Sequence, residues 1–192
     1  TLGAFQTTYG GGNFPGPGLG IVPSDVVITK FDPTGATAIF ATYFGGADNE
    51  QPHSMIVDHA GNLVVAGRTF TDDSSFPLTT NCYDHTYNGA GDIFVAKFNS
   101  SGSTLIGSTY VGGSGEDGVN VFLNEMTIGG LKHNYADDAR SEVIVDANDN
   151  IYMTSCTRSS NFPTALATQN TLGGGQDAVV IELNQNLTNL LW

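Results

Sequence analysis

The chain has very few basic residues. Lysine and arginine together number six among 192 residues, against 19 aspartates and glutamates, which gives a formal net charge of −13. The negative charge therefore comes from the scarcity of bases more than from an abundance of acids. Nucleic-acid binding needs a cationic surface, so this composition argues against it. An acidic surface rich in glycine, threonine and asparagine is typical of a secreted protein.

Long apolar runs are also missing, and cysteine is rare. No segment approaches the roughly 20 apolar residues that a transmembrane helix needs, so we expect no such span. The two cysteines, Cys82 and Cys156, could form a disulfide in an oxidising compartment or remain separate thiols, and the sequence leaves both open. His85, three residues from Cys82, is too little to indicate zinc.

Motifs of common enzymes are absent as well. The sequence contains no Gly-x-Ser-x-Gly elbow, no His-Glu-x-x-His and no phosphate-binding loop. The adjacent acids Glu116 and Asp117 lie in a glycine-rich turn, which suits glycosidase geometry poorly. We therefore predict that the chain is not an enzyme. The histidines are scattered and are expected at the surface: His53, His59, His85 and His133.

What the chain does have is an eight-residue motif that occurs three times. The motif is Asp, then alternating apolar positions, then Lys or Glu, Phe or Leu, and Asn or Asp. Its copies occupy residues 25–32, 92–99 and 177–184. A segment that returns this closely indicates a structural repeat. Because its leading Asp follows a turn, we expect that residue to cap the turn rather than bind a ligand.

The similarity between copies extends well beyond the motif. Residues 35–46 and 102–113 each read as a turn, a strand and a Gly-Gly breaker. Residues 55–67 and 143–155 each read as a hairpin, because their turn residues tolerate a positive φ. The predicted strands of a unit are 54–58, 62–68, 25–31 or 92–98, and 37–44 or 104–111. The recurring aromatic residues are expected in the core: Phe31, Phe98, Tyr43 and Tyr110.

The repeat divides the chain into four parts. The spacing is about 67 residues between the first two motif copies and about 85 between the next two. The parts are a partial unit 1–24, a repeat 25–91, a repeat 92–176 and a partial repeat 177–192. The longer repeat contains an insertion at 118–138, which either makes a specific contact or is a decorative surface loop.

Four short strands per unit, joined by glycine-rich turns, favour an all-β fold of β-propeller blades, each a four-stranded antiparallel sheet. A parallel β-solenoid ranks second, because solenoid coils are usually much shorter than this period. A closed propeller needs about four to eight blades, more than two complete periods supply. We therefore expect an incomplete ring, a fragment of a larger propeller whose remainder belongs to the same polypeptide.

These segments, in this order, resemble the β-propeller repeats known as SBBP repeats. The matching residues are 4–12, 92–99, 108–117, 144–154 and 161–164. The resemblance implies a long secreted or cell-surface bacterial protein, of a kind common in Bacteroidota and often exported by type IX secretion. It brings no shared catalytic residues. The chain departs from the pattern at Glu182, where a Lys is usual, and at Ser155-Cys156, where the earlier copy has Gly67.

Calcium is the cofactor with the best case, although the fold requires none. Two acidic loops follow Gly-Gly at equivalent places, and their candidate oxygen ligands are Asp48, Glu50, Glu116 and Asp117. The alternative is a pair of solvated loops. Asp146, Asn148 and Asn150 imitate the start of an EF-hand loop, but the glycine and glutamate that complete it are absent, so we interpret them as a hairpin turn.

Three functions follow as hypotheses. The first is a non-enzymatic scaffold, adhesin or protein-interaction module that contacts other surface proteins. The second is a carbohydrate-binding module that uses loop aromatics such as Tyr83, Tyr87 or Tyr135. The third is a hydrolase whose site lies in the propeller channel.

Overall fold

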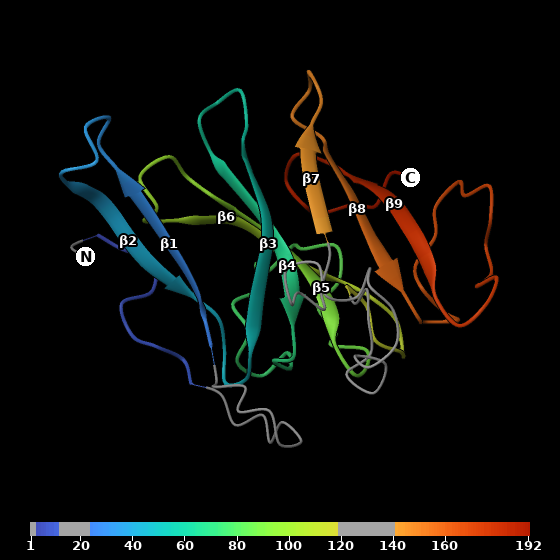
Figure 1. Ribbon diagram of the computed structural model, residues 1–192. Helices are drawn as coiled ribbons and strands as arrows, with labels where there is room; N and C mark the ends of the chain where they lie inside the picture. The colour runs from blue at the N-terminus through green and yellow to red at the C-terminus, as the bar shows by residue number, and fades with distance from the viewer. Residues whose placement is uncertain (1–2, 12–23, 119–140) are drawn as a thin grey trace, which may run out of the picture.

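The computed structural model describes residues 3–11, 24–118 and 141–192, and the described chain is built from β-strands without any helix (Figure 1). Every strand pair is antiparallel. The predicted all-β class is therefore confirmed. The strands are β1 (Val26–Phe31), β2 (Ala38–Phe44), β3 (Glu50–Val57), β4 (Leu63–Thr69), β5 (Asp92–Phe98), β6 (Leu105–Val111), β7 (Ser141–Val145), β8 (Ile151–Thr157) and β9 (Asp177–Leu183).

The strands form three sheets, which follow one another across the molecule in Figure 1. We call them the N-terminal sheet (β1-β2), the middle sheet (β3-β4-β5-β6) and the C-terminal sheet (β7-β8-β9). The three motif copies are β1, β5 and β9. Val27 pairs with Tyr43 as Phe94 pairs with Tyr110, so the motif strand has the same register with its successor in both sheets.

The two predicted hairpins join β3 to β4 and β7 to β8. Their turns contain Gly61 and Asp149 with φ values of 83° and 62°, as the sequence predicts. In the second turn, Asp146 Oδ1 accepts hydrogen bonds from the backbone N–H groups of Asn148 and Asn150, at 2.8 and 2.9 Å. The predicted turn at this acidic segment is confirmed by these bonds.

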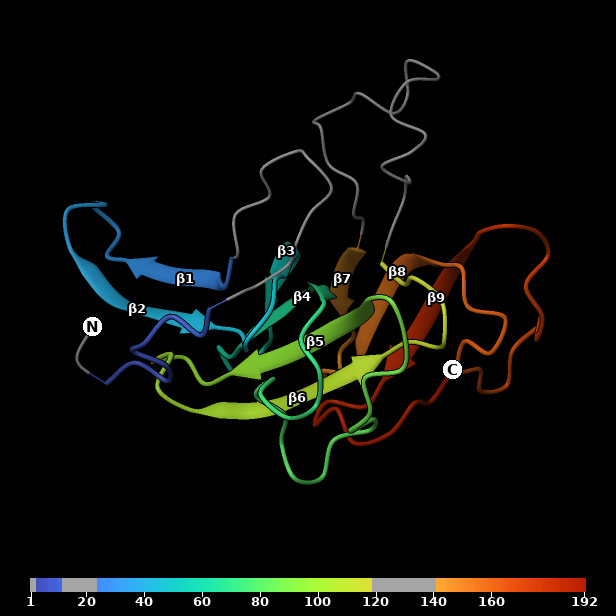
Figure 2. The ribbon, with the colours of Figure 1, turned by 90° about the horizontal axis from the view of Figure 1, so that it is seen from below.

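The central strands β4 and β5 of the middle sheet are buried on both faces, and every residue of β5 is buried, whereas β3 leaves Met55 and Val57 exposed. One face packs on the N-terminal sheet through aromatic rings, among them Phe44, Phe76 and Phe94. The other face packs on the C-terminal sheet through aliphatic side chains such as Val95 and Ile181. Seen from below, the three sheets lie face against face in a row (Figure 2). Successive side chains of β5 therefore point alternately into two different cores, one on each face of the sheet.

The outer faces of the row carry apolar side chains in the open. Phe31 is 55% exposed, whereas Phe98, at the same place in the next motif copy, is 1% exposed. Val180 is 49% exposed, whereas its counterpart Val95 is fully buried. The expectation that Phe31 packs as Phe98 does is wrong for this chain, because no described strand covers that face of β1.

The insertion at 118–138 lies outside the described residues except for Gly118, so its role stays a prediction. On one side of it Asp117 bridges to Thr157, and on the other Ser141 pairs with Ser155. Cys82 is buried, Cys156 is half-buried, and neither forms a disulfide. Nowhere in the ranges that the structure covers is there a helix long and apolar enough to cross a membrane.

Candidate functional site

Glu50 joins the N-terminal sheet to the middle sheet. It is the first residue of β3 and is only 1% exposed. Its Oε2 accepts the backbone N–H of Gly46, just beyond β2, at 3.1 Å. Its Oε1 accepts the hydroxyls of Thr69 and Thr71, at the end of β4, at 2.8 and 2.6 Å. One carboxyl group thus gathers donors from two neighbouring sheets.

Asp117 repeats this arrangement between the middle and C-terminal sheets. It is fully buried, and its Oδ2 accepts the backbone N–H of Gly113, beyond β6, at 2.7 Å. Its carboxylate also accepts the hydroxyls of Thr157 and Ser159, at the end of β8. We call Glu50 and Asp117, with these donors, the carboxylate clasps. The recurrence of Thr-x-Thr and Thr-x-Ser after β4 and β8 is the sequence signal that could have identified them.

The other two calcium candidates are half-buried and belong to the same loops. The backbone N–H of Asp48 donates to Thr71 Oγ1 at 2.9 Å, and the backbone carbonyl of Glu116 accepts from Arg158 at 3.0 Å. Across the described part of the chain, no three His, Cys, Asp or Glu side chains gather as metal ligands do. The clasp oxygens already accept N–H and O–H donors, which a cation would have to displace. Calcium binding by these residues stays an untested hypothesis, and these bonds count against it.

The leading aspartate of each motif copy accepts a backbone N–H from an earlier loop segment. The Oδ2 atoms of Asp25, Asp92 and Asp177 accept the backbone N–H groups of Gly10, Asn88 and Gly173, at 2.8, 2.9 and 2.7 Å. Asp92 and Asp177 thus bond four residues back, as expected of a turn cap, whereas Asp25 bonds to a residue fifteen positions earlier. Residues 4–11 thus hold the place that the segment before Asp92 holds one unit later.

The Gly-Gly pairs end their strands, as predicted, and they also let buried carboxyl groups lie close to the backbone. A Cβ atom on Gly112 would lie 2.5 Å from Asp92 Oδ1 and 3.0 Å from Asp117 Oδ2. A Cβ atom on Gly45 would overlap Glu50 Oε2 and lie 2.9 Å from Asp25 Oδ1. The first glycine therefore lets the motif aspartate and the clasp acid meet. These distances explain why Gly-Gly recurs after β2 and after β6, which the need to end a strand does not explain by itself.

Burial raises the pKa values of these acids. Desolvation, partly offset by the threonine hydroxyls, raises the pKa of Glu50 to about 7, and the nearby Asp25 charge adds to the effect. Desolvation, with repulsion from Asp117, raises the pKa of Asp92 to about 7. The pKa of Asp117 is also raised by burial. Asp92 Oδ1 and Asp25 Oδ1 are buried without a hydrogen-bond partner, so a protonated carboxyl suits both positions.

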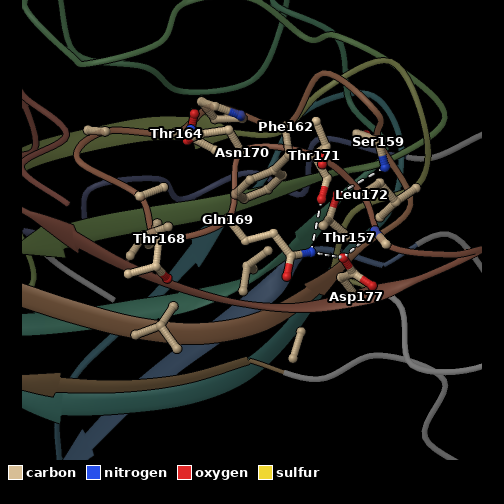
Figure 3. Close-up of a pocket in the computed structure, with 18 of the residues that line it drawn as sticks. Thr157, Ser159, Phe162, Thr164, Thr168, Gln169, Asn170, Thr171, Leu172 and Asp177 are labelled. Atoms are coloured by element: carbon tan, nitrogen blue, oxygen red, sulfur yellow. Dashed lines mark hydrogen bonds between the residues drawn. The ribbon is translucent and has the colours of Figure 1, made fainter.

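A second feature is a groove beside β9, shown in Figure 3. It has a volume of about 540 Å³ and lies between β9 and the loop 159–173. Phe162 and Leu172 contribute apolar walls, Trp192 lies among the lining residues, and Gln169 Nε2 donates to Asp177 Oδ2 at 2.8 Å across the floor. This combination of apolar walls and polar backbone can receive a ligand.

The aromatic residues expected to bind glycans turn inward. Tyr83 packs against the aliphatic core between the middle and C-terminal sheets. Tyr87 packs on Tyr110, with ring centroids 6.0 Å apart. Tyr135 lies outside the described residues. Of the histidines, His59 contacts Asp149 at 2.7 Å and links the two hairpin turns.

Comparison with known proteins adds no family. No protein-family model matches the chain, and no curated protein sequence matches it.

Proposed function

We propose that this chain is a non-enzymatic β-propeller segment of a large secreted or cell-surface protein, where it serves as a scaffold, adhesin or protein-interaction module. The observation that carries the proposal is that one sheet-to-sheet contact occurs twice. Ile28 and Phe44 of the N-terminal sheet pack on the middle sheet, and their counterparts Val95 and Val111 of the middle sheet pack on the C-terminal sheet. A unit that stacks on its successor in the same way each time can extend in both directions.

The polar contacts between sheets also recur. Lys30 Nζ donates to the backbone carbonyl of Ser100 at 3.3 Å, and Lys97 Nζ donates to that of Gln185 at 3.1 Å. Each lysine thus reaches the turn that follows the motif strand in the next sheet. With the carboxylate clasps, these bonds fix how one sheet follows another. Propeller blades are placed by repeated contacts of this kind.

The outer faces of the N-terminal and C-terminal sheets expose apolar residues. Val27 and Phe31 on one side, and Ile144 and Val180 on the other, are each 49% exposed or more. Counterparts of three of them in the middle sheet, Phe94, Phe98 and Val95, are buried. Apolar patches of this kind mark surfaces that another unit covers. We propose that further blades of a larger propeller cover these two faces.

The surface location rests on the resemblance to SBBP repeats and on the acidic composition. The scarcity of lysine and arginine suits an exported protein and disfavours a nucleic-acid partner. The partners are then the remainder of the propeller, other surface proteins and glycans.

Labelling of intact source cells with an antibody against this segment tests the location. We expect signal on intact cells, and loss of the signal after external protease treatment. An antibody to a cytoplasmic protein is the matched control and should give signal only after lysis. If the segment also appears only after lysis, the proposed location is wrong.

A further inference from the structure

The turn that follows the motif strand has the same backbone shape in all three sheets. In each turn one backbone N–H donates to the carbonyl three residues earlier, at 3.0 Å for Gly35, 2.9 Å for Gly102 and 2.9 Å for Leu187. The same three residues have positive φ values of 72°, 67° and 59°. This region of φ favours glycine, yet the third turn has a leucine. Backbone geometry therefore does not explain Leu187.

The polar contacts of this turn are the same at both junctions between sheets. Where the N-terminal and middle sheets meet, the backbone N–H of Phe5 donates to the carbonyl of Gly102 at 3.1 Å. Where the middle and C-terminal sheets meet, the backbone N–H of Tyr83 donates to the carbonyl of Leu187 at 2.8 Å. The lysine of each motif strand reaches the next turn at both junctions as well. These bonds cannot distinguish one neighbouring sheet from another.

The apolar contacts of the turn differ, because the large and the small residue have exchanged places. At the first junction β2 contributes Phe40, and a Cβ atom on Gly102 would overlap its ring. At the second junction Gly107 of β6 takes the place of Phe40, because each pairs with the lysine of its motif strand. The Leu187 side chain lies against Gly107, where an added Cβ atom would be 3.2 Å from Leu187 Cδ1.

Both large side chains are buried in the core of their own junction. Phe40 is 5% exposed and lies in the aromatic core, and Leu187 is fully buried and lies in the aliphatic core. A second position shows the same exchange. Ala96 of β5 belongs to the aromatic core, whereas its counterpart Ile181 of β9 belongs to the aliphatic core. Bulk thus comes from the preceding sheet at the first junction and from the following sheet at the second.

We propose that these size-matched pairs determine which sheet can lie beside which, so that the sheets stack in one order. A sheet that presents Phe40 requires a neighbour with glycine at the turn, because a leucine there would overlap the ring. A sheet that presents Gly107 requires the leucine, because a glycine would leave a cavity in the aliphatic core. This selectivity does not depend on whether the row of sheets belongs to a propeller.

A double-mutant cycle on the whole chain tests the first pair. Gly102→Leu should lower the melting temperature by about 6 °C or more, because its side chain overlaps Phe40. Phe40→Gly should also lower it, because a buried ring is lost. The double variant converts this junction to the second kind and should recover about half or more of the summed loss. Gly35→Leu is the matched control for the backbone cost, because nothing lies within 4 Å of its added Cβ atom.

At the second junction the sign of one substitution is informative. Leu187→Gly should lower the melting temperature by about 4 °C or more, although glycine suits the backbone better, because a cavity remains in the core. Leu166→Gly is the matched control, because Leu166 also has a positive φ, 51°, but is 87% exposed. There glycine should leave the melting temperature unchanged or raise it.

Hydrogen exchange locates each effect. It should become faster in β1 and β2 for Gly102→Leu, and in β8 and β9 for Leu187→Gly. If Gly102→Leu does not fold, a folded double variant with Phe40→Gly shows the recovery directly, and an unfolded double variant counts against the pairing. Strictly additive losses in the cycle, equal losses for Gly102→Leu and Gly35→Leu, or a Leu187→Gly variant no less stable than the unchanged chain would each overturn the proposal.

Discussion

The Oδ1 atom of Asp92 lies 2.5 Å from the point where a Cβ atom on Gly112 would sit. The motif aspartate and the first glycine of Gly-Gly are thus in direct contact, one from the start of β5 and the other from just beyond β6. Asp25 and Gly45 meet in the same way one sheet earlier. The motif aspartate and the Gly-Gly pair are separate patterns in the sequence, but in the structure they form one contact.

Substitution of Gly112 by alanine should be strongly destabilising. The added Cβ atom would overlap both the Asp92 and Asp117 carboxyls, which are buried and cannot move aside. We expect a loss of about 2–4 kcal/mol in the free energy of unfolding, as for other overpacked core sites. Gly174→Ala is the matched control, because nothing lies within 4 Å of its added Cβ atom. Equal stability of the two variants in denaturant unfolding would contradict the contact.

Stability should fall as pH rises from about 5 to about 8. Glu50 and Asp92 have folded-state pKa values raised to about 7, so the folded chain binds more protons than the unfolded chain in this window. Their stabilising contribution is full below the unfolded pKa and is lost as pH passes the folded pKa. For Glu50 alone the change is about 3 kcal/mol. Urea unfolding at several pH values measures the slope.

The variant Asp92→Asn should flatten that slope and stabilise the chain at pH 8. An amide stays neutral where the carboxyl must ionise beside Asp117, and its oxygen can still accept from Asn88. Asp177→Asn is the internal control: Asp177 also caps its turn, but Gln169 donates to it and no clasp acid faces it among the described residues. A stabilisation of both variants alike at pH 8 would refute the role of the carboxyl pair.

Lys97→Met should cost more than Lys30→Met, although the two lysines hold equivalent positions. Lys97 is buried and its Nζ lies 2.8 Å from Asp58 Oδ2, whereas Lys30 is exposed and bonds to the Ser100 carbonyl. Burial opposes ionisation of Asp58, but the Lys97 and Asn62 hydrogen bonds hold its pKa below the usual range. Removing one partner of a buried pair costs about 3–5 kcal/mol, and removing an exposed lysine about 0.5 kcal/mol or less.

The double variant Asp58→Asn with Lys97→Met separates the cost of leaving the Asp58 charge unpaired from the cost of losing the Lys97 side chain. If the cost comes from an unpaired buried charge, the double variant recovers part of it. If Lys97→Met is no worse than Lys30→Met in thermal unfolding, the ion pair does not stabilise the middle sheet.

Millimolar calcium should leave the melting temperature unchanged. The candidate oxygens on Glu50 and Asp117 already accept hydroxyl and N–H donors, and binding would have to break those bonds. A melting-temperature rise that a chelator reverses, measured at pH 8, would instead establish the calcium hypothesis.

The strands and hairpins were predictable because their signals are local. The motif fixed the alternation of β5, and Gly61 and Asp149 supply the positive φ that the turns need. Strand β3 begins at Glu50, four residues before the predicted start. The sequence pattern places Glu50 in an acidic loop, but in the structure it pairs with Thr69 of β4.

The role of the acids was missed, although the recurrence of Thr-x-Thr at 69–71 and Thr-x-Ser at 157–159 is a sequence signal for it. Glu50 and Asp117 look like calcium ligands in isolation, because the hydroxyl donors opposite them come from residues 19 to 42 positions away. The exposure of Phe31 was missed for a similar reason. Its burial depends on whether another sheet covers it, and a motif does not carry that information.

The most direct test of the account is an experimental structure of the polypeptide that carries this segment together with its flanking repeats. The account predicts further four-stranded antiparallel sheets that cover Phe31 on one side and Val180 on the other, arranged around a ring with the same clasp at every junction. Sheets stacked as a parallel solenoid, or a structure that leaves both residues exposed, would contradict it.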